Sequence, residues 1–450
     1  MTQRPKIIVL DDDPTGSQTV HSCLLLMRWD VETLRMGLAD AAPIFFILTN
    51  TRALAPDAAA QITREVCQNL KVAIAAHQES AAESIQAFLV VSRSDSTLRG
   101  HYPVETDVIA EALGPFDAHF LVPAFFEGGR ITRDSIHYLI VDGIPTPVHE
   151  TEFAQDSVFG YRHSYLPDYV AEKTAGKIPA AQVERFLLTD LRSGCLDRLL
   201  ELSNNCCVAV DAEQQDDLDR FSQDVLTAAA NGKRFLFRSA ASLLTALAQL
   251  PPQPVPAAEM AQYVRGGQPG AFVVGSHVKK TTEQLTYLLE QPQIAGIEVQ
   301  VSRLKDGAEA YAALLQETLE RLRSHHAQGQ TPVVYTSRQE LQFADSETRL
   351  QFGMTVSALL MDIVQGLPSN IGYLVSKGGI TSNDVLSQGL SLRAAWLLGQ
   401  IIPGCSVVKT SPDHPLFPNL PVVLFPGNVG TKESLALVYQ RFALGDASKD

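Results

Sequence analysis

The sequence contains few cysteines and comparatively few basic residues. Its six cysteines among 450 residues include no CxxC pair, which disfavours a zinc site and predicts reduced thiols. Lys and Arg total 36 against 50 Asp and Glu, a formal net charge of −14. This balance disfavours nonspecific binding to nucleic acid, which needs basic patches. A few local arginines still suffice to bind a small anion.

Long apolar segments are absent as well. The beginning of the sequence has no extended apolar stretch of the kind found in signal peptides, and no run approaches the length of a membrane-spanning helix. We therefore expect a soluble cytoplasmic protein with neither a membrane nor a nucleic-acid partner. With 45% hydrophobic residues, the chain is long enough for two or three domains.

Short runs rich in Val, Ile and Phe recur along the chain and alternate with amphipathic stretches. This pattern predicts an α/β protein with buried, mostly parallel strands. The runs expected as strands in the first half are Ile7–Leu10, Ile44–Leu48, Phe88–Val91, Phe120–Pro123, Cys207–Val210 and Phe235–Phe237. Those in the second half are Phe272–Val274, Ile297–Val301, Val333–Tyr335, Tyr373–Val375, Ser406–Val408 and Val422–Phe425.

Four prolines fall within six residues, at Pro251, Pro252, Pro254 and Pro256. Such a segment suits neither a helix interior nor a central strand, so it predicts a stiff linker. We expect two α/β domains with mostly parallel sheets, residues 1–250 and residues 257–450. A surface loop within one large domain is the alternative.

The first predicted strand runs directly into three carboxylates, Asp11, Asp12 and Asp13. Carboxylates at the end of a buried strand repel one another and are costly to desolvate unless a cation or a substrate proton joins them. Ligands of open α/β sheets bind at this end of the strands. The segment therefore predicts an active site, and a solvated turn that caps a helix is the structural alternative.

Two further polar segments follow predicted strands of the first half. The run Ser92–Gly100 combines arginines, hydroxyls and a carboxylate, which suit a carboxylate or phosphate together with a polyol. Arg52 follows another strand and is expected at the same sheet edge. The loop that ends at Arg130 contains two glycines and adds charge there, although alone it indicates only a turn.

Three turns rich in Gly, Ser and Thr follow strands of the second half. They are Gly275–His277, Ser376–Asp384 and Pro426–Lys432. Backbone amides in such turns can approach phosphate oxygens, so the three together indicate a nucleotide site. The sequence has no GxxxxGK[ST] loop and no GxGxxG motif.

Taken together, these segments resemble the four-carbon acid sugar kinase family, the ATP-dependent tetronate and threonate kinases. The resemblance covers nearly the whole chain in family order. The matching runs are Asp12–Gly16, Asp95–Gly100, Pro123–Phe125 with Gly129–Arg130, Gly378–Ser382 and Pro426–Gly430. The run DSTLRG at Asp95–Gly100 is the most specific of them.

The resemblance implies an N-terminal sugar-acid domain, a C-terminal nucleotide domain and an active site in the cleft between them. The residues then expected to bind substrate are Asp12, Arg52, Arg93, Ser94, Asp95, Ser96, Arg99 and Arg130. Those expected to bind ATP are Ser276, Gly378, Gly379, Ile380, Thr381, Gly427 and Asn428.

The chain departs from the family pattern at three places. Asp11 stands where the family usually has Ala, and Pro14 follows the aspartates. Arg93 stands where Lys is frequent, and Ile380 replaces the carboxylate of a common GGDT turn. These departures bear on which substrate the site accepts.

We hypothesise an ATP-dependent and Mg²⁺-dependent kinase that phosphorylates the terminal hydroxyl of erythronate, threonate or 3-oxo-tetronate, with Asp13 and Asp95 as catalytic residues. The ligands of the metal remain unassigned, and a homodimer is the working assembly. One alternative is a phosphatase of the haloacid-dehalogenase type with Asp11 as nucleophile and Asp13 as acid and base. Another is a ligand-binding relative of the kinases that has no catalytic activity.

Overall fold

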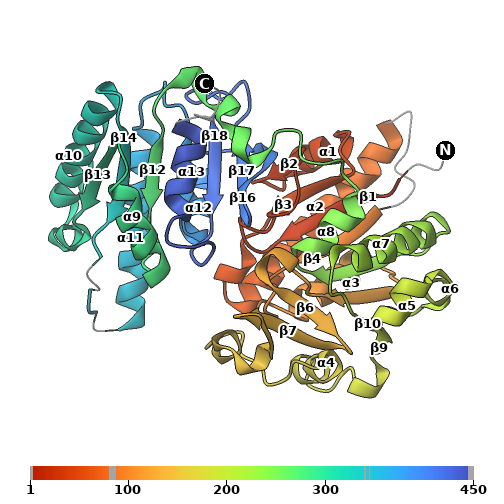
Figure 1. Cartoon of the computed structure of the whole chain (residues 1–450). Coiled ribbons are helices and arrows are strands. Elements are labelled where there is room, and N and C mark those ends of the chain that lie inside the picture. The colour runs from red at the N-terminus through yellow and green to blue at the C-terminus, as the bar shows by residue number, and fades with distance from the viewer. Residues whose placement is uncertain (1–3, 81–87, 339–340, 344, 444–450) are drawn as a thin grey trace. The chain divides into compact units, whose positions relative to one another are not determined.

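The computed structural model describes residues 4–80, 88–338, 341–343 and 345–443. These residues form two compact units, an N-terminal unit that ends at Pro252 and a C-terminal unit that begins at Gln253 (Figure 1). Within the described ranges, none of the helices is both long and apolar enough to span a membrane.

The N-terminal unit is built on a sheet whose paired strands all run parallel. Its spatial order is β2-β3-β1-β4-β11-β5-β10-β9. The strands are β1 (Lys6–Asp11), β2 (Cys23–Leu26), β3 (Ile44–Leu48), β4 (Phe88–Arg93), β5 (Ala118–Val122), β9 (Glu184–Phe186), β10 (Cys206–Val210) and β11 (Phe235–Ser239). The central residues of β1, β3, β4, β5, β10 and β11 are buried, as continuous apolar runs between two layers of helices require.

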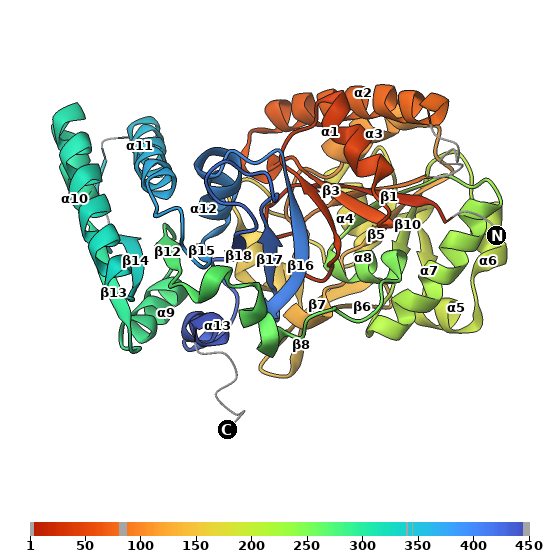
Figure 2. The ribbon, with the colours of Figure 1, turned by 90° about the horizontal axis from the view of Figure 1, so that it is seen from above.

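Helices cover both faces of this sheet. One face carries α1 (Val31–Ala39), α2 (Pro56–Ser80) and α3 (Val104–Leu113), which pack side by side (Figure 2). The other carries α5 (Leu188–Ser193), α6 (Leu196–Glu201), α7 (Gln215–Ala230) and α8 (Ala241–Ala248). Asp30 begins α1 because its carboxylate accepts a hydrogen bond of 2.9 Å from the amide of Thr33.

A small antiparallel sheet, which the sequence reasoning did not anticipate, follows β5. It consists of β6 (Arg130–Arg133), β7 (Ile136–Val141) and β8 (Ile144–Pro147), and α4 (Leu166–Lys173) comes after it in the chain. The backbone of β6 pairs with Ala212, and that of β7 pairs with Tyr165. These bridges attach the small sheet to the rest of the unit.

The C-terminal unit has a mixed sheet in the order β13-β14-β12-β15-β18-β17-β16. The strands are β12 (Ala271–Val274), β13 (Ile294–Val299), β14 (Thr331–Thr336), β15 (Leu374–Lys377), β16 (Ala394–Ile402), β17 (Cys405–Lys409) and β18 (Pro421–Phe425). One face carries α9 (Lys279–Leu289) and α13 (Ser434–Ala443); the other carries α10 (Ala308–Ala327), α11 (Ser346–Gln365) and α12 (Gly379–Asp384) (Figure 2).

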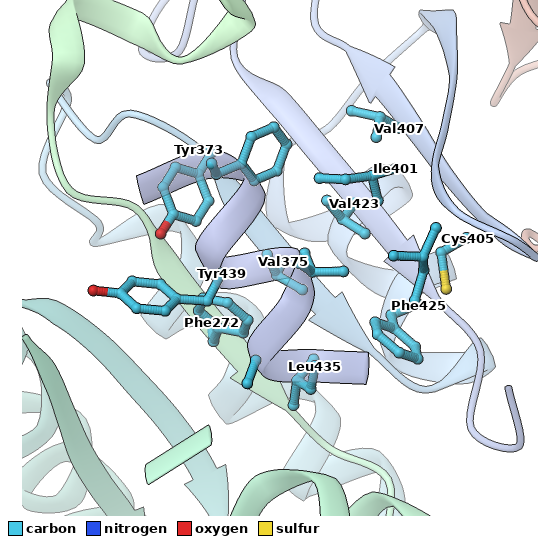
Figure 3. Close-up of a cluster of buried hydrophobic side chains, with 14 of the residues drawn as sticks. Phe272, Tyr373, Val375, Ile401, Cys405, Val407, Val423, Phe425, Leu435 and Tyr439 are labelled. Atoms are coloured by element: carbon cyan, nitrogen blue, oxygen red, sulfur yellow. The ribbon is translucent and has the colours of Figure 1, made fainter. Parts of the chain in front are cut away.

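The core of this unit lies where α13 packs on the central strands. Figure 3 shows Leu435 and Tyr439 of the helix beside Phe272, Val375 and other apolar residues of the strands. Leu435 is fully buried, so the apolar face of α13 is removed from water.

The predicted α/β class with mostly parallel sheets is confirmed. The expectation of a parallel strand at Ser406–Val408 is wrong, because β17 pairs antiparallel with both β16 and β18. Only Pro403 and Gly404 separate β16 from β17, and so short a connection forces a hairpin. The apolar run showed that a strand forms, but its direction depends on the turn.

Candidate functional site

In the N-terminal unit, four adjacent parallel strands bring their carboxyl ends to one sheet edge. Asp11 at the end of β1 pairs in register with Leu48 of β3 and with Arg93 of β4. Arg93 in turn pairs in register with Ser239 of β11. Residues far apart in the chain, such as Arg93 and Ser239, thus become neighbours.

Asp12 is the most strongly bound of the three aspartates at this edge. Its carboxylate accepts hydrogen bonds from Nε of Arg52, at 3.1 Å, and from Nη2 of the same guanidinium. Ser94 Oγ donates to it as well. The side chain is only 2% exposed, so this carboxylate is enclosed by its partners. Two-point pairing fixes the orientation of Arg52.

Asp13 differs from its two neighbours because its side chain is 21% exposed. Its Oδ1 accepts a bond of 2.8 Å from the amide of Thr15, and its Oδ2 lies 3.4 Å from Nη1 of Arg52. Burial would raise the pKa of Asp13, but Arg52 and Arg93 lower it below its usual value. Asp13 is therefore an ionised, accessible carboxylate.

Asp11 is fully buried, and its Oδ2 has no hydrogen-bond partner among the described residues. Its Oδ1 lies 3.5 Å from Nη1 of Arg93, yet burial raises the pKa of Asp11 to about 8. A Cβ on Gly16 would lie 1.9 Å from Oδ1, so only glycine fits against this carboxyl. A neutral, enclosed carboxyl cannot act as the nucleophile of a phosphatase.

A phosphatase of this type also needs an acidic pair to hold magnesium, and Asp216-Asp217 is the other pair of adjacent aspartates in the sequence. Asp217, of the pair Asp216-Asp217, is fully buried and belongs to the first turn of α7. Its carboxylate accepts a bond of 2.8 Å from Nε of Arg192. It therefore stabilises a helix start and is not presented as a metal ligand.

The guanidinium groups of Arg99 and Arg130 both lie close to one aromatic ring, that of Phe153. The guanidinium of Arg99 lies 5.0 Å from the ring centroid of Phe153, and that of Arg130 lies 6.0 Å from it. Arg99 also donates from Nε to Asp95 at 2.7 Å, while the buried Nε of Arg130 has no partner among the described residues. Arg99 and Arg130, together with the partly exposed carboxylate of Asp95, suit a ligand that carries a negative charge and hydroxyl groups.

The Asp95–Gly100 loop is held by buried groups behind it. Tyr161 donates to the carbonyl of Thr97 at 2.7 Å, and Tyr169 donates to that of Leu98 at 2.8 Å. His137 Nε2 lies 2.7 Å from the carbonyl of Ser96, and burial lowers the pKa of His137 to about 4. A neutral ring therefore donates this bond.

Sequence reasoning missed several side chains of this site. Glu105, whose carboxylate accepts a bond of 2.5 Å from Thr51, has its pKa raised to about 7 by burial and by Asp12. Arg238 donates to the carbonyl of Arg99 at 2.9 Å. Arg238 lies at the end of β11, so the strand-end criterion could have found it, whereas nothing local to Phe153 indicates its position.

In the C-terminal unit, the three predicted glycine turns meet. The amide of Gly378 donates to the carbonyl of Phe425 at 2.9 Å. Thr281 Oγ1 donates to Ser276 Oγ at 3.2 Å and to the carbonyl of Gly427 at 3.3 Å. Turns that follow β12, β15 and β18 are thereby joined into one structure.

A cavity of about 640 Å³ opens beside these turns. This volume lies within the range of small-molecule and cofactor sites. Five of the seven residues predicted to bind ATP line it, namely Ser276, Gly378, Gly379, Ile380 and Thr381. Gly427 and Asn428 do not line it, although a Cβ on Gly427 would lie 3.5 Å from Ser276 Oγ.

Other residues that line the cavity were not predicted. The rings of Phe343 and Phe352 are in contact, tilted with their centroids 5.1 Å apart, and Arg349 contributes a cation. Arg338 follows β14 and donates from Nη1 to the carbonyl of Ser276 at 2.6 Å. Aromatic rings, glycine turns and arginines that line one cavity offer both stacking and charge to a ligand.

A Mg²⁺ site cannot be assigned to side chains of the protein. Among the residues that the structure describes, no three or more His, Cys, Asp or Glu side chains are grouped to hold a metal ion. In the N-terminal unit, Asp12, Asp13 and Asp95 are each paired with arginine.

Comparison with known proteins identifies the class to which both units belong. Residues 7–247 match the family model described as a sugar-binding N-terminal domain, and residues 271–435 match the nucleotide-binding C-terminal domain. The chain belongs to the four-carbon acid sugar kinase family, as the sequence motifs predicted.

Two curated relatives carry kinase names. The chain is 25% identical to the D-erythronate kinase of Heliobacterium modesticaldum over 88% of both chains. It is 28% identical to the D-threonate kinase of Bordetella bronchiseptica over 40% of this chain and 44% of the relative. A crystal structure of a Salmonella typhimurium LT2 protein, 18% identical, superposes with a TM-score of 0.69 over 98% of this chain and all of the other, which supports the fold.

Proposed function

We propose that this protein transfers the γ-phosphoryl group of ATP to a terminal hydroxyl of a four-carbon sugar acid. Family membership and the names of the two relatives support this class of reaction. The structural observation that carries the proposal is the accessible, ionised carboxylate of Asp13 at a sheet edge rich in arginine.

The acid end of the substrate is assigned to Arg99 and Arg130. Both guanidinium groups lie close to the ring of Phe153, and Arg130 Nε has no partner among the described residues. A carboxylate placed there would gain charge-assisted hydrogen bonds. Asp95 holds Arg99 in place and presents a partly exposed oxygen to a substrate hydroxyl.

Asp13 is assigned as the acceptor of the proton that the attacking hydroxyl releases. Arg52 lies beside it and is assigned to the charge that develops on the transferring phosphoryl group, because such reactions depend chiefly on positioning and charge neutralisation. Asp12, Arg93 and Ser94 are enclosed, so we assign them to the support of Arg52 and Asp13 rather than to substrate contact.

ATP is assigned to the cavity of the C-terminal unit, whose volume, aromatic wall and glycine turns fit a nucleotide. The base would lie against Phe343 and Phe352, and the phosphates against Gly378 and Gly379. Mg²⁺, when bound to the phosphates, neutralises their charge; it usually takes only one or two protein carboxylates.

Measurement of ADP release from MgATP tests the proposal directly. The panel contains D-erythronate, both enantiomers of threonate and 3-oxo-tetronate, with a blank lacking acid. Release that depends on one of these acids supports the kinase. If none gives release while ATP still raises the melting temperature, the non-catalytic relative becomes the better description.

Asp11→Asn separates the kinase from the phosphatase. For the kinase, turnover should remain close to wild type, because Asp11 is enclosed and neutral at pH 7.

The folded-state pKa of Asp11 is raised, so its stabilising effect is present at low pH and is lost as pH rises toward 8. The variant should therefore melt higher than wild type at pH 8 and lose this advantage near pH 4. Loss of all turnover in this variant would contradict the assignment.

A further inference from the structure

One buried lysine beside the glycine turns has no role in the mechanism described above. Lys377 is the last residue of β15 and immediately precedes Gly378. Its side chain is fully buried, and its Nζ lies 4.2 Å from the ring centroid of Phe425. An ammonium group in such surroundings is costly unless an anion compensates it.

The partners of this ammonium group are backbone carbonyls. Nζ donates to the carbonyl of Pro426 at 2.5 Å and to that of Gly427 at 3.1 Å. Across the described ranges, no Asp or Glu forms an ion pair with Lys377. The titratable groups that face it are Cys405 of β17, whose thiol is kept neutral because burial raises its pKa, and Lys280 of α9, a second cation.

Lys377 also joins the turns through its backbone. Its carbonyl accepts a bond of 3.4 Å from the amide of Ser276, and the next amide, Gly378, donates to Phe425. Side chain and backbone together connect the turns after β12, β15 and β18. Figure 3 shows Cys405 and Phe425 close together on adjacent strands, which form the apolar side of this environment.

We infer that Lys377 is a positioning residue of the nucleotide site, whose buried ammonium holds the Pro426–Gly427 turn and supplies the positive charge that favours the polyphosphate of ATP. The inference rests on the proposed function and deepens it. In the described residues the ammonium group of Lys377 has no anionic partner. We infer that the phosphates of the bound nucleotide supply the compensating negative charge.

Proton uptake on nucleotide binding follows from this assignment. Burial lowers the pKa of Lys377 to about 7, so most of the free protein carries a neutral amine at pH 8. A bound polyphosphate favours the ammonium form and raises that pKa. Binding at pH 8 should therefore take up a proton, and affinity for ATP should fall as pH rises above 7.

Titration calorimetry of the full chain with MgATP at pH 8, in two buffers of different ionisation enthalpy, measures this uptake. We expect about 0.4 proton per nucleotide in the wild type, for a pKa that rises from about 7 to about 8 in the complex, and close to none in Lys377→Met. The variant should also bind MgATP about fivefold more weakly at pH 7, because about half of the free wild type is already protonated at that pH. Adenosine, which has no phosphate, should bind without uptake.

Two control variants make the result specific. Lys279→Met removes a lysine that is 92% exposed and should retain the uptake. His277→Gln removes the histidine that lines the cavity and should retain it too. If Lys377→Met does not fold, the wild type and His277→Gln still decide the question, because uptake must appear in both.

Failure of this inference is distinguishable from failure of the proposed function. MgATP binding without proton uptake, or uptake that persists in Lys377→Met, overturns the role of Lys377 and leaves the kinase intact. Uptake with adenosine also overturns it, because the anion would then not be the phosphate. Absence of any MgATP binding overturns both proposals.

Discussion

Asp13→Asn should lower the turnover number about 100-fold or more while the affinity for ATP stays close to wild type, since a general base contributes at least this much in typical cases. The amide retains Oδ1, so the bond from the amide of Thr15 persists and the turn keeps its shape. What is lost is the ability to accept a proton. Steady-state kinetics with saturating sugar acid and calorimetry with MgATP measure the two quantities.

A matched control for Asp13 is Asp216→Asn. Asp216 also faces an arginine, Arg220 at 2.9 Å, but its side chain is 60% exposed on α7. Removal of this exposed pair should leave turnover unchanged, because exposed ion pairs contribute little. Unchanged turnover in Asp13→Asn itself would remove Asp13 from the mechanism and leave Asp95 as the candidate base.

Gly378→Ala should weaken MgATP binding about tenfold or more, because forcing a side chain into this backbone conformation costs about 1–3 kcal/mol. Gly378 has φ +121° and ψ 143°, a region that residues with a Cβ rarely adopt. A Cβ there would also lie 3.1 Å from Cβ of Ser276, and thus push the turns after β12 and β15 apart. Calorimetry measures the affinity, and affinity for the sugar acid should not change.

Gly307→Ala is the control for backbone strain. Gly307 also has a positive φ, +91°, but no atom lies within 4 Å of the position of its Cβ, and it does not line the cavity. It should lower the melting temperature without a change in MgATP affinity. Equal loss of affinity in both variants would mean that general destabilisation, and not the shape of the turn, weakens binding.

Much of the fold was predictable because buried parallel strands have continuous apolar sequences. The runs at Ile44–Leu48 and Val333–Tyr335 needed no further information. Five of the strands that were missed carry a weaker signal: β2 and β9 have only four and three residues, and β6 to β8 lie outside the main sheet with partly exposed faces. The prediction also omitted β16, although its nine residues are largely apolar and buried.

The candidate sites were predictable to the extent that their residues directly follow strands. Asp13 and the turn at Gly378 were found in this way, and Arg238 and Arg338 could have been. Phe153 and Phe352 could not, because an aromatic residue within a turn or a helix does not differ locally from one in a core. Their positions depend on packing between segments far apart in the chain.

The sequence by itself determined the α/β class, the family and the segments at which polar groups gather, because each follows from local apolar patterns and short motifs. Only the tertiary structure decided how the three adjacent aspartates differ. Asp11 is enclosed beside Gly16, Asp12 is bound by Arg52, and Asp13 remains accessible. The charge state and exposure of each aspartate depend on its burial and on the nearest guanidinium groups. The local sequence specifies neither, so identical side chains come to differ.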